Sequence, residues 1–205
     1  MRAEATIREP TVEQWRAAIV DRRDHWRQNY LQGTNRAHHV VSVAGVVGAM
    51  AVALLDWEQP ALSVPFVVQA VAVLASAVAV WLASAAAFPP VGRHLVGFPV
   101  PGGLLRARRA QLAARVGCAP ADLVFADRRP DLGGLRAFAS TLVLPLASTV
   151  SLDLDDPAIR ADLYLAWGVW YVSEQLGALL RHAVRAELVA MPLVAVGWWL
   201  GEVLS

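Results

Sequence analysis

The sequence contains no lysine, and all 18 of its basic residues are arginine. Without lysine, the chain cannot form the G-x-x-x-x-G-K loop with which many enzymes hold nucleotide phosphates. It also has no G-x-S-x-G elbow for a nucleophilic serine and no histidine followed by glutamate, which excludes an H-E-x-x-H zinc site. These absences predict a protein that is not an enzyme and that holds no cofactor or metal.

Cysteine content and net charge exclude two further classes. The single cysteine, Cys118, rules out an internal disulfide and a metal site built on several thiolates. A net charge of +1 argues against nucleic acid as a partner, because such binding requires a clustered basic surface. No cleavable signal peptide is expected, because the first 38 residues are polar and charged and contain no short apolar core.

Two long uncharged runs stand out in a chain that is 57% hydrophobic. One covers residues 40–55 and the other covers residues 64–88. A membrane-spanning helix needs about 20 mostly apolar residues, with about 17 as the lower end. The second run meets this length outright, and the first meets it if His39 and Trp57 lie at the two membrane surfaces. A soluble helix as long as the second run would need a polar face, which this run lacks.

The segment between the two runs, Asp56 to Ser63, contains two acids and a proline. Such a segment does not continue a helix through lipid. We therefore expect residues 39–88 to form an antiparallel transmembrane hairpin. Small residues spaced four apart let helices approach closely, and in the first run they predict a packing face that includes Ala44, Gly45 and Gly48.

The distribution of arginine predicts the orientation of the hairpin. Seven arginines precede the first run and five follow the second before residue 116, whereas none lies between the runs. Because cytoplasmic segments of membrane proteins are rich in basic residues, we expect the N-terminus in the cytoplasm. The many alanines, valines and arginines are typical of a GC-rich bacterial genome, so the expected location is the bacterial inner membrane.

Residues 1–38 are predicted to form a cytoplasmic segment with one amphipathic helix. Thr11 and Gln14 have the spacing of a capping box, which marks a helix start. Residues 12–32 then carry a broad apolar face. The Gly-Thr-Asn sequence at residues 33–35 is expected to end this helix.

Residues 89–158 are expected to hold a small cytoplasmic α+β part. A connector rich in proline and glycine leads to a basic helix at residues 104–116, and short strands are expected at 123–126 and 135–152. The second of these stretches could equally be a re-entrant membrane segment. Three arginines of the basic helix suit anionic lipid headgroups, with an ordinary solvated face as an equal alternative. They are Arg106, Arg108 and Arg109.

Three aspartates, Asp153, Asp155 and Asp156, precede the last region of the chain. Acids complement the positive end of a helix dipole, so these residues predict a helix start. A divalent-ion site is the weaker alternative.

Residues 159–205 are expected to contain an aromatic-rich helix followed by a C-terminal transmembrane helix at residues 188–204. Trp167, Trp170 and Glu174 on the first helix are predicted to make helix-packing or interface contacts. A glutamate inside the bilayer would be unfavourable and usually functional. We therefore favour a position outside the bilayer for the first helix over a membrane crossing.

Several short motifs follow one another in the middle of the chain. They are Leu112-Ala113-Ala114-Arg115-Val116-Gly117, Leu123-Val124-Phe125, Ala137-Phe138-Ala139, Asp155-Asp156-Pro157 and Arg160-Ala161-Asp162-Leu163. Together with the preceding hairpin, this order resembles the HtpX-like membrane zinc metallopeptidases. Where that family has His-Glu-x-x-His, this chain has Leu165-Ala166-Trp167-Gly168-Val169, which can neither ligate zinc nor act as a general base. The resemblance therefore implies a descendant without that catalysis.

The leading hypothesis is a non-catalytic accessory, assembly or stabilising subunit of a larger membrane complex, with membrane lipids and other membrane subunits as partners. The second hypothesis is a membrane hydrolase, or a derivative of one, with a site near Ser173, Glu174 and His182. The third is a small sensor or effector whose cytoplasmic part gates a membrane-permeabilising hairpin.

Overall fold

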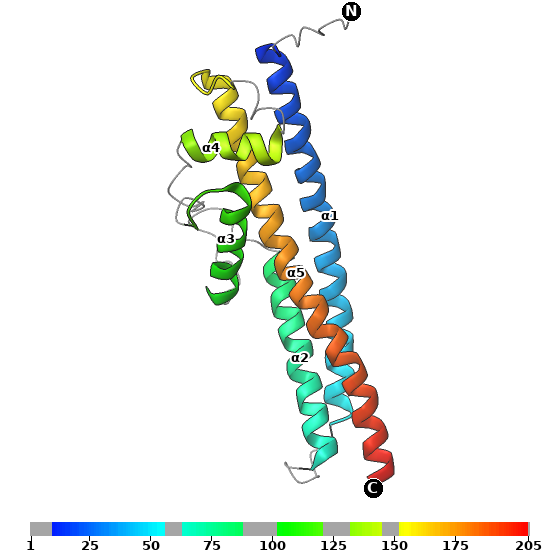
Figure 1. Ribbon diagram of the computed structural model, residues 1–205. Coiled ribbons are helices and arrows are strands. Elements are labelled where there is room, and N and C mark those ends of the chain that lie inside the picture. The colour runs from blue at the N-terminus through cyan, green and yellow to red at the C-terminus, as the bar shows by residue number, and fades with distance from the viewer. Residues whose placement is uncertain (1–9, 56–62, 88–101, 121–131, 145–151, 205) are drawn as a thin grey trace, which may run out of the picture. The chain divides into compact units, whose positions relative to one another are not determined.

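A computed structural model describes residues 10–55, 63–87, 102–120, 132–144 and 152–204 (Figure 1). All regular secondary structure in these residues is helical. The elements are α1 (Val12–Ala53), α2 (Val64–Ala87), α3 (Gly102–Val116), α4 (Leu132–Phe138), the π-helical turn η2 (Ala139–Val143) and α5 (Pro157–Leu204).

Contacts divide the chain into two units. Unit 1 contains residues 1–29 and 102–173, and unit 2 contains residues 30–101 and 174–205. Helices α1 and α5 each contribute residues to both units.

Helix α1 begins where the sequence predicts. The backbone N–H of Thr11 donates to Oε1 of Gln14 at 2.9 Å, and the N–H of Gln14 donates to Oγ1 of Thr11 at 3.3 Å. These two bonds form the capping box and confirm that prediction.

The predicted break at residues 33–35 is wrong, because α1 continues without interruption to Ala53. Gly33 lies directly against the side chain of Leu176 on α5, where a β-carbon would collide with it. The hydroxyl of Thr34 donates to the carbonyl of Tyr30 at 3.1 Å, one helical turn earlier. Glycine lowers helix stability by about 1 kcal/mol relative to alanine, and here the close approach to α5 uses its small size.

Helix α5 is also longer than predicted. The sequence indicates two helices, but Pro157–Leu204 is one helix of 48 residues with Pro192 in its interior. Asp156 caps its start, since Oδ1 accepts hydrogen bonds from the N–H groups of Ala158 (2.7 Å) and Ile159 (3.3 Å). The predicted acidic helix start is therefore confirmed.

The predicted α+β part is not supported. Residues 135–143 were expected in a strand, but they belong to α4 and η2. Leu135, Phe138, Ala139 and Val143 are all buried, and their spacing of three to four residues is the period of a helix face. The other expected strand, at 123–126, and most of the stretch after residue 144 lie outside the described residues. The predicted basic helix is confirmed as α3.

Unit 1 is built around a cluster of aromatic side chains. Phe138 lies 4.9 Å from Trp167, 5.4 Å from Trp170 and 5.8 Å from Trp26, measured between ring centroids. Trp167 and Trp170 also contact each other edge to face at 5.7 Å. Such pairs stabilise a core beyond their buried area. Aliphatic side chains of α1, α3 and α5 complete this core, namely Ile19, Leu112, Val116, Ile159 and Leu163.

One ion pair joins α1 and α5 within unit 1. Nε of Arg16 donates to Oδ2 of Asp162 at 2.9 Å. This hydrogen bond, together with the negative charge of Asp162, raises the pKa of Arg16. The pair links one face of α1 to one face of α5, and the arginine stays charged at every physiological pH.

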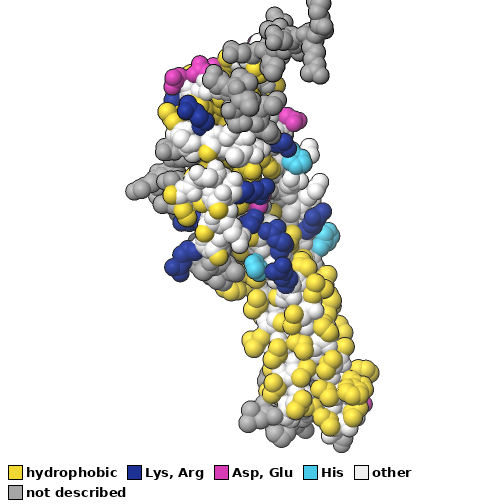
Figure 2. Space-filling view, viewed as in Figure 1, with side chains coloured by type: hydrophobic (Ala, Val, Ile, Leu, Met, Phe, Trp, Pro, Cys, Tyr) yellow, Lys and Arg dark blue, Asp and Glu magenta, His cyan; other side chains and the backbone are white. Residues whose placement is uncertain are grey.

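Unit 2 contains the segments that can cross a membrane. Helices α1, α2 and α5 are each long and apolar enough to do so, and the chain is therefore a multi-pass membrane protein. Figure 2 shows hydrophobic side chains covering the outer surface of these segments, with arginine and histidine side chains gathered at one end of them. Large apolar side chains outside the bundle suit lipid as the surrounding solvent.

The expected antiparallel hairpin is present in unit 2. Gly48 of α1 lies against Ser76 of α2, and Ala51 packs with Ala72 in one buried cluster. As residue numbers rise along α1, those of the contacted α2 residues fall, so the two helices run in opposite directions. Val194 of α5 joins the same cluster and adds the third helix.

Alanines repeat every seven residues inside unit 2. Ala37, Ala44 and Ala51 on α1 are fully buried. The same spacing holds for Ala72 and Ala79 on α2, and on α5 for the buried residues Leu176, Ala183 and Ala190. A seven-residue repeat keeps one face of each helix toward its neighbours in left-handed packing. Small residues on that face let the three backbones approach closely.

Candidate functional site

Four polar side chains are buried in the described part of unit 2, and three of them, Gln69, Ser76 and Glu187, carry side-chain atoms without a described hydrogen-bond partner. Their exposed fractions are 2% for Gln69, 1% for Ser76 and 5% for Glu187. Buried polar groups in a membrane bundle are unfavourable unless they are hydrogen-bonded, and they commonly mark function.

Gln69 reaches from α2 to α5. Its Nε2 donates to the backbone carbonyl of Val194 at 3.4 Å, while Oε1 has no partner among the described residues. Gly197 makes room for the amide, because a β-carbon there would lie 2.7 Å from Cδ of Gln69. The missing side chain at Gly197 thus permits this polar link between α2 and α5.

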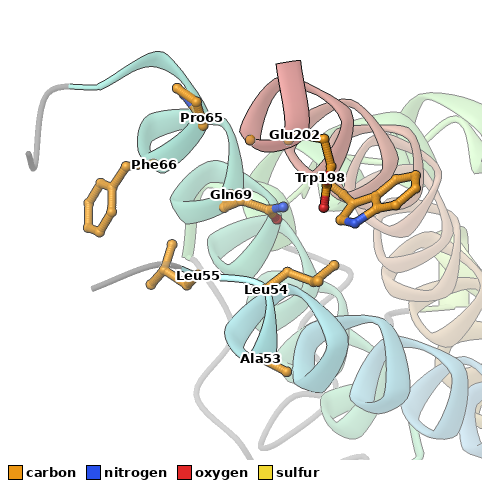
Figure 3. A pocket seen from close by; sticks show the side chains of 10 residues that line it. Ala53, Leu54, Leu55, Pro65, Phe66, Gln69, Trp198 and Glu202 are labelled. Atoms are coloured by element: carbon orange, nitrogen blue, oxygen red, sulfur yellow. The ribbon is translucent and has the colours of Figure 1, made fainter. Parts of the chain in front are cut away.

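A pocket of about 390 Å³ opens beside Gln69. It is lined by the end of α1, the start of α2 and the end of α5 (Figure 3). In Figure 3 the side chain of Gln69 extends toward Trp198 and Glu202, whereas the ring of Phe66 points away from them. Apart from Gln69 and Glu202 the lining side chains are apolar, so this pocket offers few groups that could bind a polar ligand.

Ser76 follows Ala72 by about one helical turn on α2. Its Cβ would be 3.2 Å from a β-carbon placed on Gly48, and its hydroxyl has no described partner. This spacing is tighter than ordinary van der Waals contact. Gly48 therefore serves the packing of α1 on α2 within this chain.

Glu187 is the one buried ionisable side chain in the described part of unit 2. Both carboxyl oxygens are buried, and neither has a hydrogen-bond partner among the described residues. In the sequence, Glu187 directly precedes the expected last span at residues 188–204. The continuous α5 instead places it in the same helix as that span, on the face that packs into the bundle.

The predicted packing face of the first span is partly buried and partly exposed. Ala44 is buried and Gly48 contacts Ser76, so both pack within the chain. Gly45 is exposed, and a β-carbon there would meet nothing within 4 Å. A role for Gly45 in binding another subunit stays a prediction.

The other predicted site residues are distributed over both units. Trp167 and Trp170 lie in the core of unit 1, and Glu174 is half-buried at the start of the α5 segment of unit 2. The three arginines predicted to meet lipid headgroups lie on α3, where Arg106 is exposed while Arg108 and Arg109 are half-buried. Contact with lipid stays a prediction for all three.

The residues of the alternative hydrolase site do not converge. Ser173 and His182 lie on the same helix nine residues apart, which separates them by about 13 Å along its axis. A hydrogen-bonded relay needs about 3 Å between donor and acceptor. Among the described residues, no three His, Cys, Asp or Glu side chains are grouped as a metal site would require.

No family model, curated protein or solved structure matches the chain.

Proposed function

We propose that this protein is a non-catalytic subunit of the bacterial inner membrane that assembles with, or stabilises, a larger membrane protein complex. The observation that carries the proposal is the exposed small-residue face of α1 in unit 2. Gly45 and Ala49 are spaced four residues apart, both are exposed, and the space around Gly45 is open. Small residues spaced in this way on a lipid-facing surface allow another helix to dock closely.

The other small-residue pair of the first span supports this proposal, because it is packed within the chain. Ala44 and Gly48 have the same spacing; Ala44 is fully buried, and Gly48 packs against Ser76 of α2. The first span thus carries two such faces, and the described residues cover only one of them. A second helix from another subunit would cover the face of Gly45 and Ala49 in the same manner.

The proposed orientation places the N-terminus in the cytoplasm. In unit 2, Gly33 meets Leu176 and Ala51 meets Val194, so α1 and α5 run in parallel with one fixed offset in residue number. The arginines of the two helices, Arg36 on α1 and Arg181 on α5, therefore lie toward the same end of the span bundle. Basic residues at one end of a bundle favour the cytoplasmic side.

The experiment is extraction in mild detergent followed by native mass spectrometry of the wild type and of Gly45→Leu. The matched control is Gly201→Leu, because Gly201 on α5 also has open space around it. The proposal expects wild type and control to co-purify with other membrane chains at a fixed ratio, and Gly45→Leu to lose them. A wild-type protein that is isolated alone contradicts the proposal, and unchanged assembly of Gly45→Leu excludes this face.

A further inference from the structure

The surroundings of Glu187 follow from the registers of the three helices. Gly33 lies against Leu176, and Ala51 shares one buried cluster with Val194; both pairs give an offset of 143 residues between α1 and α5. Applied to Glu187, this offset places Ala44 at the same level. The residues between these two contacts are helical in both α1 and α5, so the register is continuous.

The α2 register gives the third member of the level. Helices α2 and α5 run in opposite directions, so residues at the same level have numbers with a constant sum. Gln69 lies against Gly197, and Ala72 shares one cluster with Val194; in both pairs the sum is 266. The same relation places Ala79 opposite Glu187. Ala44 and Ala79 are both fully buried. Glu187 therefore belongs to a layer of two alanines and one carboxyl, one heptad away from the layer of Ala51, Ala72 and Val194.

This layer lies inside the apolar part of the bundle. Ala44 is four residues beyond the start of the uncharged run at Val40, or about 6 Å along the helix. Ala79 is nine residues before the end of its run at Phe88, or about 13 Å. The carboxyl thus lies below the membrane surface on the side that carries the arginines.

Among the described residues of α1 and α2, no other titratable group faces Glu187 across the bundle. Neither α1 from Val40 to Ala53 nor α2 contains a charged or titratable side chain. On α5 the nearest ones are His182, which is half-buried more than a turn away, and Arg181 and Arg185, which are exposed. A charged carboxylate at this level would have no described counter-charge.

We propose that Glu187 is a proton-binding site within the membrane bundle, and that uptake and release of this proton change the packing of α1, α2 and α5. Binding converts the carboxylate and one proton into the neutral acid, and no other reactant is needed. The neutral acid fits between two alanines, whereas the anion would draw water or separate the helices. Changes of pH would thereby be transmitted to the bundle, and this inference does not depend on the proposed function.

A proton suits this layer better than a metal cation does. Calcium and magnesium require six or more oxygen ligands at close range. The layer offers two methyl groups and one carboxyl, and the nearest additional described oxygen donor on α2, the hydroxyl of Ser76, is about one turn away. A proton needs only the carboxyl itself.

The first test is infrared spectroscopy of the full chain in lipid nanodiscs, comparing wild type with Glu187→Gln. The control is Glu202→Gln, which removes an exposed carboxyl from the same helix. We expect the C=O band of a protonated carboxylic acid in the wild type at neutral pH, retained in Glu202→Gln and lost in Glu187→Gln. Absence of any such difference at neutral and mildly acidic pH overturns the proposal, as does displacement of the proton by sodium or calcium.

The second test measures melting of the same three proteins from mildly acidic to mildly alkaline pH. Release of the proton should lower the melting temperature of the wild type and of Glu202→Gln by at least about 4 °C. The melting temperature of Glu187→Gln should not change over this range, because its amide cannot ionise. Identical pH profiles of wild type and Glu187→Gln would overturn the coupling of the proton to packing.

Discussion

The two units of this protein pack their helices with residues of different size. The core of unit 1 is filled by large side chains, with Phe138 among three tryptophans. The interior of unit 2 is lined mainly by alanine, and its large apolar side chains, such as Val46, Leu74 and Leu188, are exposed. In water, burial of apolar area favours large residues inside. In lipid that driving force between helices is absent, and close approach of small residues takes its place.

The largest effect is expected from removing the central ring of unit 1. Phe138→Ala should destabilise the unit by about 3–5 kcal/mol, because it leaves a cavity between buried tryptophans. Tryptophan fluorescence during chemical unfolding of the full chain measures this. Leu132→Ala in the same helix is the control, since Leu132 is exposed. A loss below about 1 kcal/mol, as for an ordinary surface substitution, would contradict the aromatic core.

In unit 2, enlarging a small residue should lower stability, because the added atoms overfill the helix interface instead of leaving a cavity. Ala79→Leu is expected to cost about 1–3 kcal/mol by forcing helices apart, whereas Val78→Leu, which enlarges an exposed neighbour, should be close to neutral. Thermal melting in nanodiscs compares the two variants. Equal tolerance of both substitutions would mean that Ala79 does not face its neighbours.

A smaller effect is expected at the start of α5. Asp156→Ala removes the side chain that accepts hydrogen bonds from Ala158 and Ile159, and loss of such a cap costs about 1 kcal/mol. Asp156→Asn should retain most of the stability, because its amide oxygen can accept the same bonds. Chemical unfolding of the three proteins distinguishes a cap from a charge effect, and equal losses in both variants would contradict the cap.

Local signals in the sequence predicted much of this fold. The two uncharged runs correspond to the second part of α1 and to α2, and both helix caps are where Thr11 and Asp156 predict them. The break at residues 33–35 was wrong because glycine also permits close helix contact, as Gly33 does with Leu176. Without knowledge of that neighbour, a glycine in a polar stretch indicates the end of a helix.

The strand prediction failed for a related reason. Val and Thr favour strands in general, but the buried positions in α4 and η2 follow a helical period. Thr141 donates a hydrogen bond from its hydroxyl to the carbonyl of Ala137 at 2.7 Å, which keeps it within the helix. The packing of these residues within the core of unit 1 selects the helix, and that packing is not encoded in residues 135–144 alone.

The candidate site was only partly predictable. Gln69 is noticeable as a polar residue in an apolar run, but nothing local distinguishes Glu187 from the other charged residues at the end of a helix. Its position becomes apparent only when the seven-residue spacing of α5 is combined with the registers of α1 and α2. Pair contacts between distant segments, rather than composition, identify it.

The most direct test of the account is whether Ala44, Ala79 and Glu187 share one layer. In a Cys118→Ser background, Ala44→Cys combined with Ala79→Cys places one thiol on each of α1 and α2, and mild oxidation in membranes shows whether they join. The account predicts a rapid intramolecular disulfide for this pair and none for Ala44→Cys combined with Val78→Cys, whose second position is exposed. Cross-linking of the Val78 pair without the Ala79 pair would contradict the register, and with it the buried position of Glu187 in the membrane bundle.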